Sequence, residues 1–419
     1  MKTIPRRTFL AASGFGAATL VTGMGTQIAL GQSSGGADKV IVIHLRGGAD
    51  GLSMTPPYGD SSYYDARPNT AVPPPGSAGG ALPLTSASSG GKASFPTGLD
   101  GVVGMHPALE PIYSSLWTSG QLAVVVAAGL PDATRSHFSA ERYVSRGGPK
   151  GSIAQGGWLG RAADSMPSNG PITSIHGRRS GALVDGSHNT VELLDGLTKF
   201  GFDGLRNRNS HPQQDLAQAA ITAMYGGGAD EVSRSGMKAL EVIEQVADLT
   251  SERAAEYPSN QYATALQEFA VLNAAGISMR GAALRRGAWD HHRDLKASFT
   301  DQAGQLASGI RAFADDTGLE GVTLVVVTEF GRTVGENSGQ GTDHGLGFSA
   351  LVMGAGIRGG VYGDDYPERL AAGDARPELP VLTDYRKMLS EVLTKRAGIT
   401  NLSAVFPDYR QNGVLGLAR

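Results

Sequence analysis

Three short apolar segments rich in β-branched residues predict buried strands. They are Lys39–Leu45 (KVIVIHL), Leu122–Ala128 (LAVVVAA) and Val322–Thr328 (VTLVVVT), and Ser349–Gly354 is a weaker fourth candidate. Apolar and polar residues do not alternate regularly in them, as they would in a strand with one face in water. We therefore expect these segments to lie in a mostly parallel sheet that is covered on both faces.

Helical segments separate the predicted strands. Pro107–Ser119 precedes the second strand, and Asp294–Thr317 precedes the third. The longer helix carries apolar residues at steps of three, four or seven, which place one face toward a core: Leu295, Phe299, Leu306, Ile310 and Phe313. Alternating strands and helices predict a three-layer α/β fold with a mostly parallel central sheet and helices on both faces.

Two segments interrupt this alternation and are predicted to be insertions. Residues 72–98 are rich in Pro, Gly and Ser, which favours a surface loop or an irregular hairpin. Residues 216–286 are rich in Ala, with a break at Tyr257-Pro258, and we expect an almost entirely helical layer there. Because strands from both ends of the chain contribute to one sheet, residues 32–419 are predicted to form a single domain.

The first 31 residues resemble a twin-arginine export signal. Arg6-Arg7 precedes a weakly apolar stretch, and Ala29-Leu30-Gly31 offers small residues for cleavage near Gln32. The alternative is a membrane anchor, but four glycines interrupt the stretch, which lacks about twenty strongly apolar residues. We expect the twin-arginine export machinery as a partner, a location in the periplasm or outside the cell, and no stable membrane insertion after cleavage.

The composition narrows the possible functions. Cysteine is absent, which excludes disulfides, thiolate metal sites, iron–sulfur clusters and cysteine nucleophiles. The net charge of −3 argues against a general nucleic-acid-binding protein, because neutralising phosphates requires an excess of Lys and Arg. The chain holds 60 glycines in 419 residues, about twice the average share, which predicts many tight turns.

Candidate chemical groups follow the predicted strands, at the sheet edge where open α/β sheets bind ligands. They occur in four groups, which are Asp50; Thr134, Ser136 and His137; Asp290, His291 and His292; and Glu329, Arg332, Asp343 and His344. Because His291 and His292 are adjacent, their side chains point in different directions, and at most one of them is expected to be a ligand. Carboxylate and imidazole groups together suit divalent cations such as Zn, Mn, Mg or Ca. The sequence therefore predicts a metal site formed by these loops.

Each group also has a structural alternative. Asp50 is followed by Gly51 and could be a turn residue, Asp290 could cap the following helix, and Ser136 could be a helix N-cap. Glu329 could form a buried ion pair with Arg332 without any metal. The Asp343-His344 pair lies among glycines and could be an ordinary turn, although it is the strongest local signal of the set.

The motifs together resemble an exported bacterial family, the domain of unknown function 1501. They are, in chain order, the twin-arginine start, LRGGADG at 45–51, RSHF at 135–138, Trp-Asp-x-His at 289–292, EFGRT at 329–333 and Asp343-His344. The resemblance covers essentially the whole chain after the signal. The family belongs to the alkaline-phosphatase-like superfamily, which also contains sulfatases and cofactor-independent phosphoglycerate mutases.

The resemblance implies two divalent cations at the carboxyl edge of a parallel sheet. Asp50 matches the metal aspartate after the first strand, Asp290 and His292 match an Asp-x-His pair for one cation, and Asp343-His344 match the element for the other. Glu329 lies where a strand-end ligand is common. Either Ser136 or Thr134 would be the nucleophile, His137 a metal ligand or substrate contact, and Arg332 or Arg135 would stabilise charge on the substrate.

The leading functional hypothesis is therefore an exported metal-dependent hydrolase that acts on a phosphate or sulfate ester of a small molecule or polymer. The alternative from another class is a non-catalytic binding or assembly protein that retains the fold. A redox enzyme with an organic cofactor ranks last, because Gly47-Gly48 after the first strand is not a G-x-G-x-x-G motif.

Overall fold

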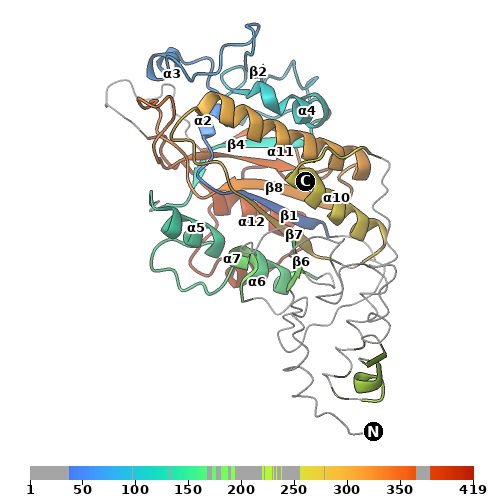
Figure 1. Cartoon of the computed structure of the whole chain (residues 1–419). Coiled ribbons are helices and arrows are strands. Elements are labelled where there is room, and N and C mark those ends of the chain that lie inside the picture. Colours follow the sequence, from blue (N-terminus) through green and yellow to red (C-terminus); the bar gives the residue numbers. More distant parts are fainter. Residues whose placement is uncertain are drawn as a thin grey trace.

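A central sheet of nine strands organises the protein in the computed structural model (Figure 1). The structure describes residues 37–167 apart from 97, 132 and 133, short stretches between 172 and 237, residues 255–364 apart from 278, and residues 378–419. The predicted export signal, residues 1–31, lies outside the described residues, as does most of the segment 216–254.

The strand order across the sheet is β10-β4-β9-β8-β1-β7-β5-β6, with β11 also paired to β4. The strands are β1 Lys39–Leu45, β4 Leu122–Gly129, β5 Ile172–Ile175, β6 Thr190–Leu193, β7 Gly281–Arg286, β8 Val322–Thr328, β9 Phe348–Met353, β10 Gly360–Tyr362 and β11 Thr383–Asp384. Only β9 runs antiparallel to its neighbours β4 and β8, and the other pairs are parallel. The expectation of an α/β fold with a mostly parallel sheet is confirmed.

Helices cover both faces of this sheet (Figure 1). One face carries α10 Gln261–Ala274, α11 Leu295–Thr317 and α4 Glu110–Ile112, and the other carries α5 His137–Arg146, α6 Trp158–Ser165 and α12 Tyr385–Lys395. The remaining short helices are α2 Gly51–Met54, α3 Ser61–Ala66, α7 Gly181–Val184 and α13 Leu402–Val405. The predicted apolar face of α11, from Leu295 to Phe313, is fully buried.

Two separate cores lie on the two faces of the sheet. Ile41 and Ile43 of β1 pack in the core under α10 and α11. Val40 and Val42, the alternate residues of the same strand, pack in the core with α6 and α12. Because a strand that is buried on both faces needs apolar residues at every position, this packing explains why β1 lacks alternation.

One helical expectation needs correction, and another is confirmed with a change in helix type. Residues 281–286, predicted as the end of a helical insertion, form β7, which pairs with β1 and lies inside the sheet. A Cβ at Gly281 would lie 1.9 Å from the Val40 carbonyl oxygen, so close strand pairing there requires glycine. The predicted helix over 107–119 is confirmed as one continuous helical stretch, which begins as a 3₁₀ turn at Pro107 and contains a π-helical turn over Tyr113–Trp117.

The Pro-, Gly- and Ser-rich segment 72–98 consists mainly of turns. Its one short strand, β2 Leu82–Pro83, pairs antiparallel with β3 Gly104–Met105. No helix in the described part of the chain is long and apolar enough to cross a bilayer.

Candidate metal centre

Four loops at one edge of the sheet bring the predicted site residues together. These loops follow the carboxyl ends of β1, β4, β7 and β8, which all point the same way, because β9 is the only strand with reversed direction. His137 begins α5 after β4, Asp290 and His292 follow β7, and His344 lies in the long loop after β8. The convergence arises from the parallel topology rather than from nearness in sequence.

His137 is held by a buried carboxylate. Its Nδ1 lies 3.0 Å from Oε1 of Glu329, which also accepts the Gly47 N–H at 2.7 Å. Since a carboxylate only accepts, Nδ1 of His137 carries the hydrogen, and Nε2 faces Asp290 Oδ2 at 3.4 Å. Burial acts to raise the pKa of Glu329, but the hydrogen bonds from His137 and Gly47 and the proximity of His44 lower that pKa to about 2.

His344 and His292 are oriented in the same way. Nδ1 of His344 lies 2.8 Å from the carbonyl oxygen of Arg135, which can only accept. Nδ1 of His292 lies 3.4 Å from Oδ1 of Asp343. Burial lowers the pKa of His344, which favours its neutral form. In the neutral ring of His344, therefore, the hydrogen is on Nδ1 and the lone pair is on Nε2, and the contact with Asp343 favours the same orientation of the His292 ring.

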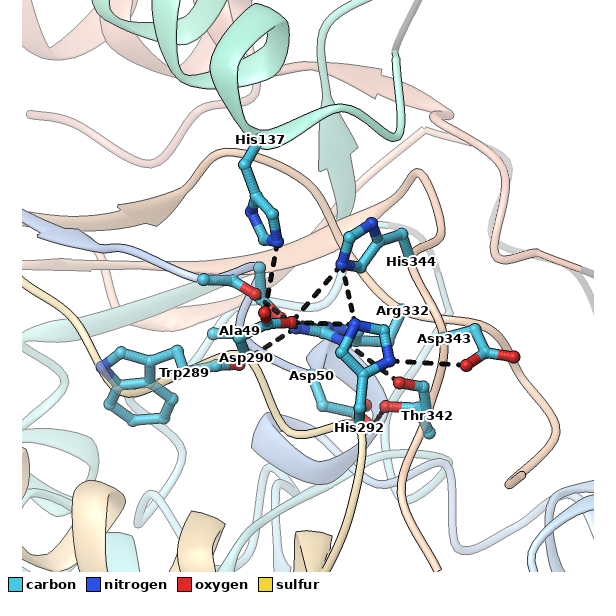
Figure 2. A network of polar contacts seen from close by, with 12 residues as sticks. Ala49, Asp50, His137, Trp289, Asp290, His292, Arg332, Thr342, Asp343 and His344 are labelled. Atoms are coloured by element: carbon cyan, nitrogen blue, oxygen red, sulfur yellow. Dashed lines mark hydrogen bonds and ion pairs between the residues drawn. The ribbon is translucent and has the colours of Figure 1, made fainter. Parts of the chain in front are cut away.

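The three Nε2 atoms converge on Asp290 (Figure 2). The ligand atoms of His137, Asp290 and His344 lie within 4.8 Å of one another. Nε2 of His292 lies 3.0 Å from Nε2 of His344 and 3.1 Å from Oδ1 of Asp290. Nε2 of His137 is buried and makes no hydrogen bond within the described part of the chain.

This arrangement fits a cation. Nitrogen lone pairs and a carboxylate that face one another repel unless a proton or a metal cation lies between them, and a single cation would offset the repulsion among all of these groups. The two imidazoles and one carboxylate of His137, Asp290 and His344, with the His292 ring beside them, offer nitrogen and oxygen ligands that suit zinc and related transition metals. Acceptors that fix the opposite ring nitrogen, as Glu329, the Arg135 carbonyl and Asp343 do here, are usual behind metal-binding histidines.

Arg332 ties the loops of the site together. Its guanidinium donates to the carbonyl oxygens of Gly47, Gly48 (2.6 Å), Thr342 (3.0 Å) and Trp289 (3.3 Å). It also donates to Oδ1 of Asp290 at 2.5 Å. The alternative of a Glu329–Arg332 ion pair is wrong, because Arg332 pairs with Asp290. Since its side chain is only 1 % exposed, the contacts favour a structural role for Arg332 rather than its predicted contact with substrate.

Asp50 lies at this edge but is committed to other partners. Its Oδ1 caps α2 by accepting from the N–H groups of Leu52 (2.9 Å) and Ser53 (3.1 Å). Its Oδ2 forms a fully buried ion pair with Arg67 at 2.8 Å. The same oxygen, Oδ2, also accepts a hydrogen bond from Thr342 Oγ1 at 3.4 Å. The guanidinium of Arg67 thus supplies the positive charge that a cation was expected to supply at Asp50.

The other predicted residues surround the centre. Glu329 and Asp343 stand behind His137 and His292. Ser136 is the N-cap residue of α5 and is exposed, without a capping hydrogen bond from its side chain, and Thr134 Oγ1 accepts the Ser136 N–H at 3.3 Å. Ser136 lies directly between the Arg135 carbonyl and His137, which both contact the centre.

The sequence left open whether His137 is a metal ligand or a substrate contact, and it gave no indication of Arg67. The position of His137 after a strand of the predicted sheet was an available signal. Arg67 lies at the end of α3, outside any strand loop, so its local sequence contains no comparable signal.

Comparisons with known proteins identify a family but no activity. A family model described as "Protein of unknown function (DUF1501)" matches residues 101–372. No curated protein matches the chain. Among solved structures, the alkaline phosphatase from the Antarctic bacterium TAB5 is similar, with 11% identity, coverage of 78% of this chain and 95% of that chain, and a TM-score of 0.31.

A variant of that phosphatase solved with bound Mg is similar at 10% identity, with the same coverage and a TM-score of 0.28. TM-scores in this range are too low to transfer any property of the phosphatase to this chain.

Proposed function

Since the chain belongs to the DUF1501 family, whose description names no activity, we propose its function from the site: a metal-dependent hydrolase of phosphate or sulfate esters. The observation that carries the proposal is the convergence of three imidazole Nε2 atoms on the Asp290 carboxylate. A site that binds a cation at a solvent-accessible sheet edge, with Asp290 and His292 nearly half exposed, supports chemistry on a bound ligand rather than a purely structural metal.

We propose that His137, Asp290, His292 and His344 hold one divalent cation. The resemblance implies two, but Asp50 is paired with Arg67, and Glu329 and Asp343 each face an imidazole from behind. A bound divalent cation would polarise the ester oxygen and lower the pKa of a hydroxyl or water beside it. The imidazoles and Asp290 would hold this cation at the solvent-exposed side of the site.

Ser136 is the proposed nucleophile. Its backbone neighbours on both sides contact the centre, and it stands at the N-terminus of α5, where the helix dipole favours an alkoxide by about 0.3–1 kcal/mol. In the first step its oxygen bonds to phosphorus or sulfur, the ester P–O or S–O bond breaks, and the alcohol leaves with the proton that the Ser136 hydroxyl gives up. Water then releases phosphate or sulfate from Ser136. Thr134 is the second candidate for this role.

We also propose that the protein acts outside the cytoplasm after twin-arginine export. The support is the pattern of Arg6-Arg7 followed by a weakly apolar stretch. Replacing both arginines with lysine should retain the precursor in the cytoplasm, as measured by fractionation and immunoblotting. Continued export of that variant would contradict the proposal.

Metal analysis together with an ester panel tests the proposed function. We expect about one equivalent of divalent cation in the wild type and much less in His344→Gln, while the matched control His106→Asn, at a buried histidine outside the centre, keeps the cation. With the cation bound, the wild type should hydrolyse p-nitrophenyl phosphate or sulfate, and Ser136→Ala should not. A wild type that binds no cation contradicts the site. Cation binding without hydrolysis of any ester favours the non-catalytic binding protein.

A further inference from the structure

A polar pocket opens directly beside the proposed cation site. It has a volume of about 440 Å³ and is lined by His292, Arg293, Asn337, Ser338, Gly339 and Asp343. One of these residues, His292, is a proposed ligand of the cation, and Asp343 stands directly behind it, so a molecule in the pocket would lie next to the reacting group. The volume is of the size that small-molecule sites have.

The wall of the pocket is fixed by Asn337, which has no hydrogen-bonding capacity left for a ligand. Its Nδ2 donates to the His292 carbonyl oxygen and to Asp343 Oδ1, both at 3.1 Å. Its Oδ1 accepts from the N–H groups of Gly339 at 2.9 Å and Gly341 at 3.1 Å. Asn337 therefore shapes the pocket by joining the loop after β7 to the loop after β8, and recognition depends on the other lining groups.

Arg293 supplies the positive charge of this pocket. Its side chain is exposed, and no carboxylate of the described residues forms an ion pair with its guanidinium. Because it follows His292 directly in the chain, the backbone that places His292 at the centre also places Arg293 at the pocket. A free guanidinium with a planar set of donors is well suited to bind a carboxylate.

The lining offers little to an apolar ligand. Its one ring is the imidazole of His292, and the rest of the lining is polar, with the hydroxyl of Ser338, the guanidinium of Arg293 and the backbone of Gly339. An aryl or acyl group placed here would bury apolar surface against polar atoms and deprive those atoms of water, which costs free energy. Hydroxyl groups on the ligand would replace the lost water contacts.

We propose that this pocket binds the alcohol part of the ester and that Arg293 binds an acidic group on it. The substrate would then be a phosphate or sulfate ester of a hydroxylated carboxylic acid, such as a sugar acid, rather than an aryl or lipid ester. This proposal rests on the proposed hydrolase function, and it adds the class of substrate and a residue that selects it.

The kinetic test compares two esters that differ only in the acidic group, glucuronate 1-phosphate and glucose 1-phosphate. We expect the wild type to prefer the glucuronate ester by about tenfold in kcat/KM, the effect of one charge-assisted hydrogen-bonded contact. In Arg293→Gln this ratio should fall to about one. The matched control Arg358→Gln alters an exposed arginine before β10, at the opposite edge of the sheet, and should keep the wild-type ratio. Equal kcat/KM values in the wild type, or a preference that survives in Arg293→Gln, would overturn the proposal.

A binding measurement separates failure of this proposal from failure of the hydrolase function. Ligand-observed NMR with free glucuronate, and with glucose as the neutral comparison, requires no turnover. Glucuronate binding that exceeds glucose binding in the wild type and disappears in Arg293→Gln supports the pocket even if no ester is hydrolysed. Equal signals from the two sugars would overturn it even in an active hydrolase.

Discussion

Two carboxylates of the site, Glu329 and Asp343, lie behind imidazole rings rather than among the atoms that face Asp290. Glu329 is completely buried and accepts from His137 Nδ1, Gly47 N and Thr328 Oγ1. Its hydrogen bond raises the pKa of His137. The role of Glu329 is therefore to fix the ring of His137 with Nε2 turned toward the centre, which makes it a positioning residue.

Replacing Glu329 with Gln tests this role. The amide keeps the shape but removes the charge that holds the His137 N–H, so cation affinity should fall by about 10- to 100-fold, as for other acceptors behind metal-binding histidines. Competition with a chelator of known affinity measures the change. Glu320→Gln, at an exposed glutamate before β8, is the matched control. Unchanged cation affinity in a folded Glu329→Gln protein would show that Glu329 only supports packing.

Replacing Asp50, at the same sheet edge, should lower the stability of the protein rather than its affinity for a cation. Both side chains are buried, and Arg67 also donates to the carbonyl oxygens of Val334 at 2.6 Å and Thr333 at 2.8 Å. Asp50→Asn leaves this arginine without a counter-charge and should lower the free energy of unfolding by about 3–5 kcal/mol. Urea unfolding measures that loss, and metal analysis should show the cation retained. Loss of the cation from the folded variant would instead assign Asp50 to cation binding.

At the scale of whole elements, apolar runs predicted β1, β4 and β8 closely, because strands that are buried on both faces need such runs. The strand β7 was missed, because its sequence GAALRR has no β-branched residue and its place depends on pairing with β1. The reversed direction of β9 is also set by its neighbours rather than by its own residues. Local sequence signals indicated the loops that carry the candidate ligands, because those loops follow recognisable strands. The pairing of His137 with a glutamate 192 residues away depends on the tertiary fold and could not be predicted.

The 3₁₀ turn at Pro107–Leu109 carries a prediction of pH dependence. His106 is buried, accepts the Ala108 N–H at 3.1 Å through Nδ1, and has its pKa lowered by burial from 6.5 to about 4. Below pH 6.5 the unfolded chain therefore binds a proton that the folded protein does not, and stability falls as the pH drops from 6.5 to about 4. The loss from this residue is on the order of 3 kcal/mol.

His106→Asn keeps a capping oxygen but cannot titrate, so it should remove this part of the acid-induced loss. Urea unfolding at pH 6.5, 5 and 4 in the wild type and the variant gives the difference. All other ionisable groups are the same in the two proteins, so their contributions cancel in the comparison. Identical pH dependence in the two proteins would contradict the assignment.

At the scale of the whole molecule, the proposed cation would join three separate loops, those that follow β4, β7 and β8. A cation bound only by the folded protein stabilises it by about 2.7 kcal/mol when its concentration is 100 times the dissociation constant. The melting temperature should therefore rise with added zinc and fall with chelator. In Asp290→Asn it should respond to neither, and an equal response of that variant would place the stabilising cation elsewhere.

The central place of β1 has a consequence for how the chain is made. Its two neighbours in the sheet, β7 and β8, begin at Gly281 and Val322, which are synthesised long after Lys39. At a synthesis rate of about 5–20 residues per second, β1 leaves the ribosome roughly 12–50 s before either partner exists. Throughout that interval a strongly apolar strand has two open edges, so nascent chains of this protein should depend on a holding chaperone until residue 328 has emerged.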